Sequence, residues 1–223
     1  MRSPALLLTP LVVAAAFAAD PPGQAEVYRA MGIRPEAILN GSILAAKVVE
    51  GGARQTVAIA TYLTGKKEDA DAVGVKLVVF DAASGLKPLY ERDFAKENAG
   101  FVGRGEIQLV DLDGDGLMEI LPSWDNVRSK LVDERRGEVL VREGGAFKVG
   151  WSGELKYDAT RAVREVPDDR RDRYEREVDI PATIKTRGIT LFFNKKVQAV
   201  AGQRLPAPRI VRETFPLRPP PPE

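Results

Sequence analysis

The sequence predicts an all-β protein built mainly from antiparallel strands. From residue 41 onward, short runs rich in β-branched and aromatic residues alternate with clusters of Gly, Asn and Asp, which is the pattern of strands and turns. Several of these runs end directly in Gly-containing turns, so hairpins are the expected building unit. The expected strands cover residues 42–49, 56–63, 75–80, 86–91, 106–110, 117–121, 138–141, 147–151, 189–193 and 197–200. Asn194 and Lys195 are expected at the turn of a hairpin formed by the last two strands.

Residues 1–18 have the plan of a secretory signal peptide. Arg2 is the only charge in the first 19 residues, and an apolar run at 6–17 ends in small residues. Cleavage is expected after residue 18, with Ala19 as the second choice. The apolar run is shorter than the ~20 residues of a membrane-spanning helix, so an uncleaved anchor is the less favoured alternative. The mature protein is therefore expected in the periplasm or outside the cell, without a membrane span.

The rest of the chain divides into a leader, a domain and a tail. Residues 19–40 form an N-terminal leader with a short helical pattern that Gly32 ends. Residues 41–215 form the β-rich domain. The tail at 216–223 holds five prolines, which favour an extended chain over a place in a sheet.

A weak internal repeat suggests how the domain is built. Two apolar hairpins with Gly-containing turns carry Lys87 and Lys148 at equivalent positions, and each follows two other expected strands. The domain is therefore interpreted as blade-like units at about 41–95, 104–153 and 178–215. Three units are fewer than a closed propeller usually has, so we expect propeller-blade-like four-stranded units in an open array, or alternatively a β-sandwich.

Two segments do not fit the strand pattern. Residues 125–136 are consistent either with a helix or with a long connection between strands. Residues 161–177 are dense in charges of alternating sign, which is typical of a solvated loop or exposed helix.

The composition excludes several classes of function. The chain has 223 residues, of which 33 are Lys or Arg and 32 are Asp or Glu, so no strong field of one sign favours nucleic acid as a partner. It contains no Cys and no His. Disulfides, thiolate or imidazole metal sites, Cys nucleophiles and imidazole-dependent hydrolases are therefore excluded.

One acidic loop carries a specific chemical signal. Acids stand at its first, third, fifth and ninth positions, namely Asp111, Asp113, Asp115 and Glu119. Calcium prefers six to eight oxygen ligands, and a tight loop of alternating carboxylates turns several of them toward one centre. The loop therefore predicts a calcium site.

The residues between the acids complete this loop. Gly116 permits the positive φ that reverses the chain. The Leu117 carbonyl then becomes a seventh-position ligand while its side chain is buried, and the ninth-position carboxylate closes the site. An EF-hand needs a glutamate at the twelfth position, but Pro122 stands there and the flanks are expected strands, so an EF-hand is excluded.

The loop and its flanking apolar residues, 107–110 and 119–121, resemble the strand-loop-strand core of the FG-GAP or VCBS-type repeat of integrin-α-like propellers. That resemblance implies calcium bound by Asp111, Asp113, Asp115, the Leu117 backbone and Glu119. It covers one repeat in the middle of the chain. Position nine is Glu where the family usually has Asp, and no second acidic loop is present.

Two functions remain open from the sequence. The favoured one is an exported, calcium-stabilised β-rich protein that binds a protein or glycan ligand or has a structural role, without catalytic residues. The alternative is an exported glycan hydrolase that uses two carboxylates. Trp124 and Trp151 could stack on a sugar ring, but their place in or beside expected strands favours core packing.

Overall fold

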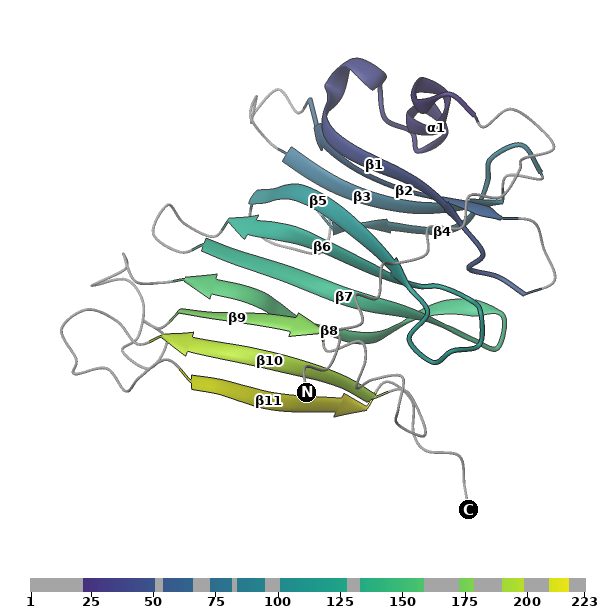
Figure 1. Ribbon diagram of the computed structural model, residues 1–223. Coiled ribbons are helices and arrows are strands. Elements are labelled where there is room, and N and C mark those ends of the chain that lie inside the picture. Colours follow the sequence, from purple (N-terminus) through teal and green to yellow (C-terminus); the bar gives the residue numbers. More distant parts are fainter. Residues whose placement is uncertain are drawn as a thin grey trace, which may run out of the picture.

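The computed structural model describes residues 22–50, 54–65, 73–81, 84–94, 101–127, 133–158, 173–178, 190–198 and 209–216. Within these ranges the chain forms two antiparallel sheets (Figure 1). One has four strands in the order β1-β2-β3-β4, and the other has seven in the order β11-β10-β9-β8-β7-β6-β5. The strands are β1 (Ile38–Ala46), β2 (Gln55–Leu63), β3 (Val73–Asp81), β4 (Lys87–Asp93), β5 (Phe101–Val110), β6 (Glu119–Val127), β7 (Asp133–Glu143), β8 (Ala146–Asp158), β9 (Arg173–Val178), β10 (Thr190–Gln198) and β11 (Arg209–Pro216).

The all-β, antiparallel class is confirmed, and so are both hairpins of the suspected repeat. The β3–β4 turn contains Gly85 at φ +73°, and the β7–β8 turn contains Gly144 and Gly145 at φ +59° and +84°. Each sheet follows the chain as a simple meander, which is also the strand order within a propeller blade. The expected first unit corresponds to the four-stranded sheet.

The expected second and third units are not separate sheets. They merge into the seven-stranded sheet because β8 pairs with β9. The expected hairpin turn at Asn194 and Lys195 was wrong, since β10 runs through both residues and pairs with β9 on one side and β11 on the other. Neither residue is the glycine that favours a tight hairpin turn, and apolar residues on both sides suit a continuous strand.

The main core lies between the two sheets. Apolar residues of both sheets form one buried cluster, which is compatible with a β-sandwich and with an open array of blade-like units. The first sheet, with its flanking segments, contributes Val48, Val57, Ile59, Val75, Leu77, Val79 and Phe94, and the second contributes Ile107, Ile120, Trp124 and Leu140.

β5 makes the closest approach between the sheets, because it lies against β1, β2 and β3. Glycine allows this approach at position 105. A Cβ there would lie 2.6 Å from Val75 Cγ1 and 3.0 Å from Ile59 Cδ1. The Gly105 N–H also donates a hydrogen bond of 2.7 Å to the Thr61 hydroxyl, which satisfies a buried polar group across the interface.

The outer face of the first sheet is covered by α1 (Gln24–Ala30), which confirms the short helix expected in the leader (Figure 1). The helix ends before Gly32, whose φ is +74°. Small side chains at Ala58 and Ala60 let the helix approach the sheet. A short 3-10 helix, Pro35–Ala37, leads from there into β1. The residues of this second core are Val27, Tyr28, Met31, Ile33, Ala58, Ala60, Val78 and Phe80.

Several segments discussed in the sequence analysis lie outside the described residues or only partly within them. The expected signal peptide lies outside them, as do residues 217–223 of the tail, whereas Pro216 is the last residue of β11. The undecided segment 125–136 contains the end of β6 and the start of β7. The loop or exposed helix expected at 161–177 was wrong for 173–177, which belong to β9 and pair with β8 and β10. Among the described residues, no helix is both long and apolar enough to cross a lipid bilayer.

Candidate metal centre in the β5–β6 loop

The acidic loop connects β5 to β6, so strands flank it on both sides as the sequence predicted. Two leucines anchor it. Leu112 is fully buried and packs in a cluster on the face of the second sheet that is turned away from the first, and Leu117 is also buried. Asp113 and Asp115 lie between these two buried leucines, and Asp111 directly precedes Leu112.

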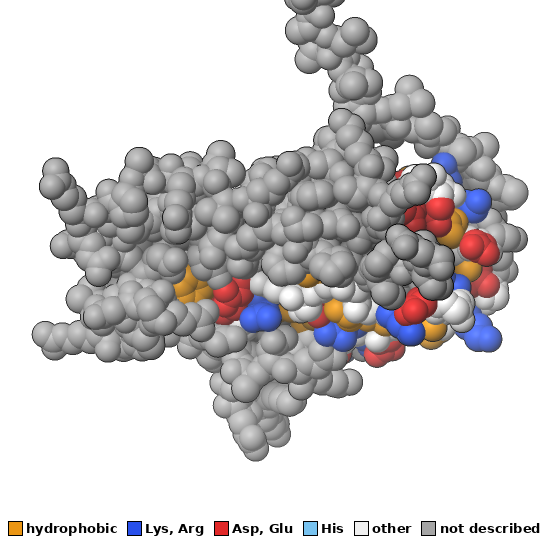
Figure 2. Space-filling view, turned by 90° about the horizontal axis from the view of Figure 1, so that it is seen from below, with side chains coloured by type: hydrophobic (Ala, Val, Ile, Leu, Met, Phe, Trp, Pro, Cys, Tyr) orange, Lys and Arg blue, Asp and Glu red, His pale blue; other side chains and the backbone are white. Residues whose placement is uncertain are grey.

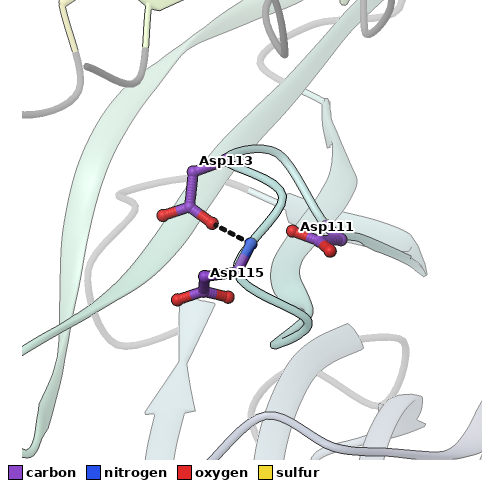
Figure 3. Close-up of side chains that lie close together, drawn as sticks. All are labelled: Asp111, Asp113 and Asp115. Atoms are coloured by element: carbon purple, nitrogen blue, oxygen red, sulfur yellow. Dashed lines mark hydrogen bonds between the residues drawn. The ribbon is translucent and has the colours of Figure 1, made fainter. Parts of the chain in front are cut away.

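The three aspartates of the loop lie together. Each of Asp111, Asp113 and Asp115 offers a carboxylate oxygen, and these oxygens all lie within 4.8 Å of one another. Figure 3 shows the three side chains along one turn of the loop, where the Asp113 carboxylate accepts a hydrogen bond from the backbone N–H of Asp115. The structure therefore brings together three of the predicted ligands.

Hydrogen bonds from the loop's own backbone orient these carboxylates. Asp111 accepts from the N–H groups of Gly114 (2.7 Å) and Gly116 (3.0 Å), and Asp115 accepts from Leu117 (2.7 Å). Both glycines have positive φ, +78° and +83°, and a Cβ at either would meet no atom within 4 Å. Their role is conformational, as predicted for Gly116. A carboxylate that accepts one N–H at an oxygen keeps lone pairs for a cation.

Glu119 lies at the base of the loop, at the start of β6. Its buried carboxylate accepts a hydrogen bond of 2.8 Å from the Leu112 N–H, which ties the two ends of the loop together. Burial raises the pKa of Glu119 to about 7, the Leu112 hydrogen bond opposes this rise, and the charges of Asp113, Asp115 and Asp111 add to it. Glu119 therefore senses the charge of the triad, and a cation there would favour its ionised form.

The loop also contacts the first sheet. The Met118 N–H donates a hydrogen bond of 2.9 Å to the carbonyl of Lys47, directly after β1. The Met118 side chain packs against the core between the sheets, whereas Leu112 packs on the opposite face of the second sheet. The loop is thus connected to both hydrophobic clusters of the second sheet, so its order is coupled to their packing.

A second polar cluster lies on β5, β6 and β7. Arg135 forms ion pairs with Glu106 and with Asp125 (3.5 Å), and donates a hydrogen bond of 2.9 Å to Ser123. Burial raises the pKa of Asp125, and the nearby Arg135 opposes that rise. Arg104 pairs with Glu106 at 2.9 Å and adopts a φ of +27° beside an irregularity in the β5–β6 pairing.

This cluster is not evident from the sequence, because the pattern of residues 125–136 is consistent with either a helix or a connection between strands. A strand interpretation would have placed Asp125 and Arg135 on facing strands, where they are paired in register. Both tryptophans pack against hydrophobic clusters, as predicted from their places in or beside expected strands. Trp124 is 2% exposed and stacks on Phe94 with 4.0 Å between ring centroids, and Trp151 packs beside the Leu112 cluster.

Charge is mixed on the coloured part of the surface that Figure 2 shows. In the view from below (Figure 2), acidic and basic side chains alternate among the described residues, and neither sign forms a continuous region there. This agrees with the nearly balanced composition. Comparison of the chain with protein-family models, curated proteins and solved structures gave no match.

Proposed function

We propose that this chain is an exported, calcium-stabilised β-rich binding or structural protein of the FG-GAP/VCBS type. The observation that supports it best is the convergence of Asp111, Asp113 and Asp115 on one point, with carboxylate oxygens within 4.8 Å of one another. Like charges at this spacing repel one another, and a divalent cation removes the repulsion. The Leu117 carbonyl, Glu119 and water complete the proposed ligand set. The lack of His and Cys leaves oxygen donors, which suit calcium.

The proposed role of calcium is stability because the loop links two hydrophobic clusters. An ion that binds only the folded state stabilises it by about 2.7 kcal/mol at a hundredfold excess over its dissociation constant. Calcium is therefore expected to raise the melting temperature, and a chelator to lower it. Isothermal titration calorimetry and thermal unfolding by circular dichroism measure the two effects.

Variants of the loop test whether the response belongs to this site. Asp113→Ala and Asp115→Ala are expected to remain folded and to lose the calcium-dependent shift in melting temperature. Asp133→Ala is the matched control, because Asp133 is an exposed aspartate on β7 that pairs with Lys156 at 2.6 Å, outside the loop. A wild-type protein that shows neither binding heat nor a melting shift with calcium would contradict the proposal.

Export is the second part of the proposal, and its support is the sequence pattern of residues 1–18. When the full-length chain is expressed in a Gram-negative host, the periplasmic or culture protein is expected to begin at Ala19 or Asp20. N-terminal sequencing measures this directly. A secreted product that still begins at Met1 would show that the segment is not cleaved as proposed.

The alternative, a carboxylate-dependent glycan hydrolase, has weaker support in the described residues. The buried glutamates Glu134 and Glu138 lie four residues apart on one strand, about 13 Å along the backbone. Glycosidase carboxyl groups usually lie about 5 to 9.5 Å apart. Glu134 is also hydrogen-bonded to Asn126 and Arg136, and Glu138 to Arg92, which favours a structural role for both.

A further inference from the structure

The indole N–H of Trp124 is a buried hydrogen-bond donor in the core between the sheets. Trp124 is 2% exposed, and its nitrogen Nε1 is shielded from solvent. Among the described residues, no hydrogen-bond acceptor meets this nitrogen. A buried tryptophan N–H usually has a partner, because burial takes away its hydrogen bonds to bulk water. The Trp124 indole therefore points to a partner that the described residues do not supply.

A buried ion pair shares an aromatic neighbour with this indole. The Trp124 ring stacks on Phe94, with 4.0 Å between ring centroids. The guanidinium carbon of Arg92 lies 5.6 Å from the centroid of the same Phe94 ring. Arg92 also pairs with Glu138 at 2.7 Å, and the Glu138 side chain is 3% exposed. Charged and aromatic groups therefore meet around Phe94, where β4, β6 and β7 come together.

The register of β6 and β7 places Glu138 beside Trp124. Trp124 is paired with Arg136, so Glu138 is its diagonal neighbour on the adjacent strand. Diagonal neighbours on one face of an antiparallel pair lie about 7 to 8 Å apart, within reach of long side chains. Both side chains point between the sheets, since Trp124 belongs to the core there and Glu138 pairs with Arg92 of the first sheet. The Glu138 carboxylate is therefore the charged acceptor on the adjacent strand that lies toward the indole.

The sheet is irregular at this place, and the carboxylate has capacity for another donor. The β6–β7 pairing is interrupted around Pro122, which lies opposite Glu138 and has no N–H to donate. Glu138 accepts from Arg92 and, at 3.4 Å, from the Ser152 hydroxyl, both at Oε1. A carboxylate has about four acceptor positions, so these contacts are compatible with a further donor. Buried waters are typically held where such polar groups meet inside a protein.

We propose that a water molecule is bound in the core between the sheets, where it accepts the Trp124 indole N–H and donates to the Glu138 carboxylate. Water supplies an acceptor and a donor in a small volume, which suits the dense packing of a core. The charge of Glu138 disfavours an anion here, and the donors of Arg92 and Trp124 disfavour a cation. The bound water joins the aromatic stack to the ion pair, so that β4, β6 and β7 share one hydrogen-bonded network.

Nuclear magnetic resonance of the indole N–H groups tests this site in the nitrogen-15-labelled protein. The chain has two tryptophans, and Trp151, which is only partly buried, is the internal reference. The Trp124 indole proton is expected to show a dipolar cross-peak to water in a rotating-frame experiment, where its sign separates a bound water from proton exchange. In D₂O it is expected to exchange roughly 100-fold more slowly than the Trp151 proton, because its exchange requires the core to open. The Trp151→Phe variant assigns the two signals.

A matched pair of double variants tests the second partner of this water. Arg92→Met with Glu138→Leu removes the acceptor without leaving an unpaired buried charge, and it is expected to abolish the water cross-peak of Trp124. Lys148→Met with Glu143→Leu is the control. It removes an ion pair whose side chains are 58% and 62% exposed, and it is expected to keep the cross-peak.

Two results overturn the water site. One is a wild-type Trp124 indole proton without a dipolar cross-peak to water, including the case of slow exchange alone, which indicates a direct bond to another part of the chain. The other is a cross-peak that persists in the Arg92→Met, Glu138→Leu variant. If that variant does not fold by circular dichroism, Glu138→Gln replaces it. Its neutral amide oxygen is expected to keep the cross-peak and to shift the Trp124 indole proton, and an unchanged shift contradicts the bridge to Glu138.

Discussion

Arg92→Met is expected to lower the free energy of unfolding by about 3 to 5 kcal/mol, because it leaves a buried carboxylate without its main counter-charge. Arg92 on β4 pairs with Glu138 on β7 at 2.7 Å, and the Glu138 side chain is 3% exposed. The pair joins the two sheets at the edge of their shared core. Methionine keeps most of the aliphatic length of arginine, so the change removes charge more than volume.

Urea denaturation, monitored by circular dichroism, measures this loss of unfolding free energy. Two further variants serve as comparisons. Arg92→Met combined with Glu138→Gln is expected to recover much of the loss, since no unpaired charge remains. Lys148→Met is the matched control. It breaks an ion pair with Glu143 whose side chains are 58% and 62% exposed, and exposed pairs contribute about 1 kcal/mol or less. Equal losses for Arg92→Met and Lys148→Met would argue against a buried ion pair between the sheets.

Phe94→Ala is expected to cost about 3 to 5 kcal/mol of unfolding free energy, the usual range for a buried phenylalanine. Phe94 is fully buried directly after β4 and stacks on Trp124 of β6, with 4.0 Å between ring centroids. Its removal leaves a cavity at a contact between the two sheets. The change in tryptophan fluorescence gives a local readout, because Trp124 loses its stacking partner.

Phe147→Ala is the matched control for that prediction. Phe147 on β8 makes a similar aromatic contact, with Tyr90 at 5.5 Å, but it is only partly buried at the margin of the same core. We therefore expect a clearly smaller loss of stability from Phe147→Ala in the same chemical denaturation. A larger effect at Phe147 than at Phe94 would mean that the core is not centred between the sheets.

The features that could be predicted from the sequence are those set by neighbouring residues. Alternation of apolar runs and turns identified β1 to β8 and both Gly-containing hairpins, because strand and turn preferences act within a few residues. The acidic loop could be predicted for the same reason. Asp111, Asp113 and Asp115 fall within five residues, and Gly114 and Gly116 supply the positive φ that brings the carboxylates together.

The local sequence pattern was not enough to assign secondary structure where a segment was compatible with either a strand or a turn. Asn194 and Lys195 were assigned to a turn, but their pairing with β9 and β11 makes them the middle of a strand. Pro122 would ordinarily exclude a central strand, yet it lies in β6 between β5 and β7. The β6–β7 pairing is interrupted between Ile120 and Ser123, around the proline, which has no N–H to donate.

By itself, the sequence determined the strand-forming segments of β1 to β8, the geometry of the acidic loop and the exclusion of Cys and His chemistry, but not β9 and β11. Only the tertiary structure decided that β5 to β11 form one sheet, that Arg92 neutralises a glutamate 46 residues away, and that Arg135 gathers Glu106 and Asp125. The reason is physical. Backbone preferences act over a few neighbouring residues, whereas burial and charge pairing depend on which distant segments the packed sheets bring together.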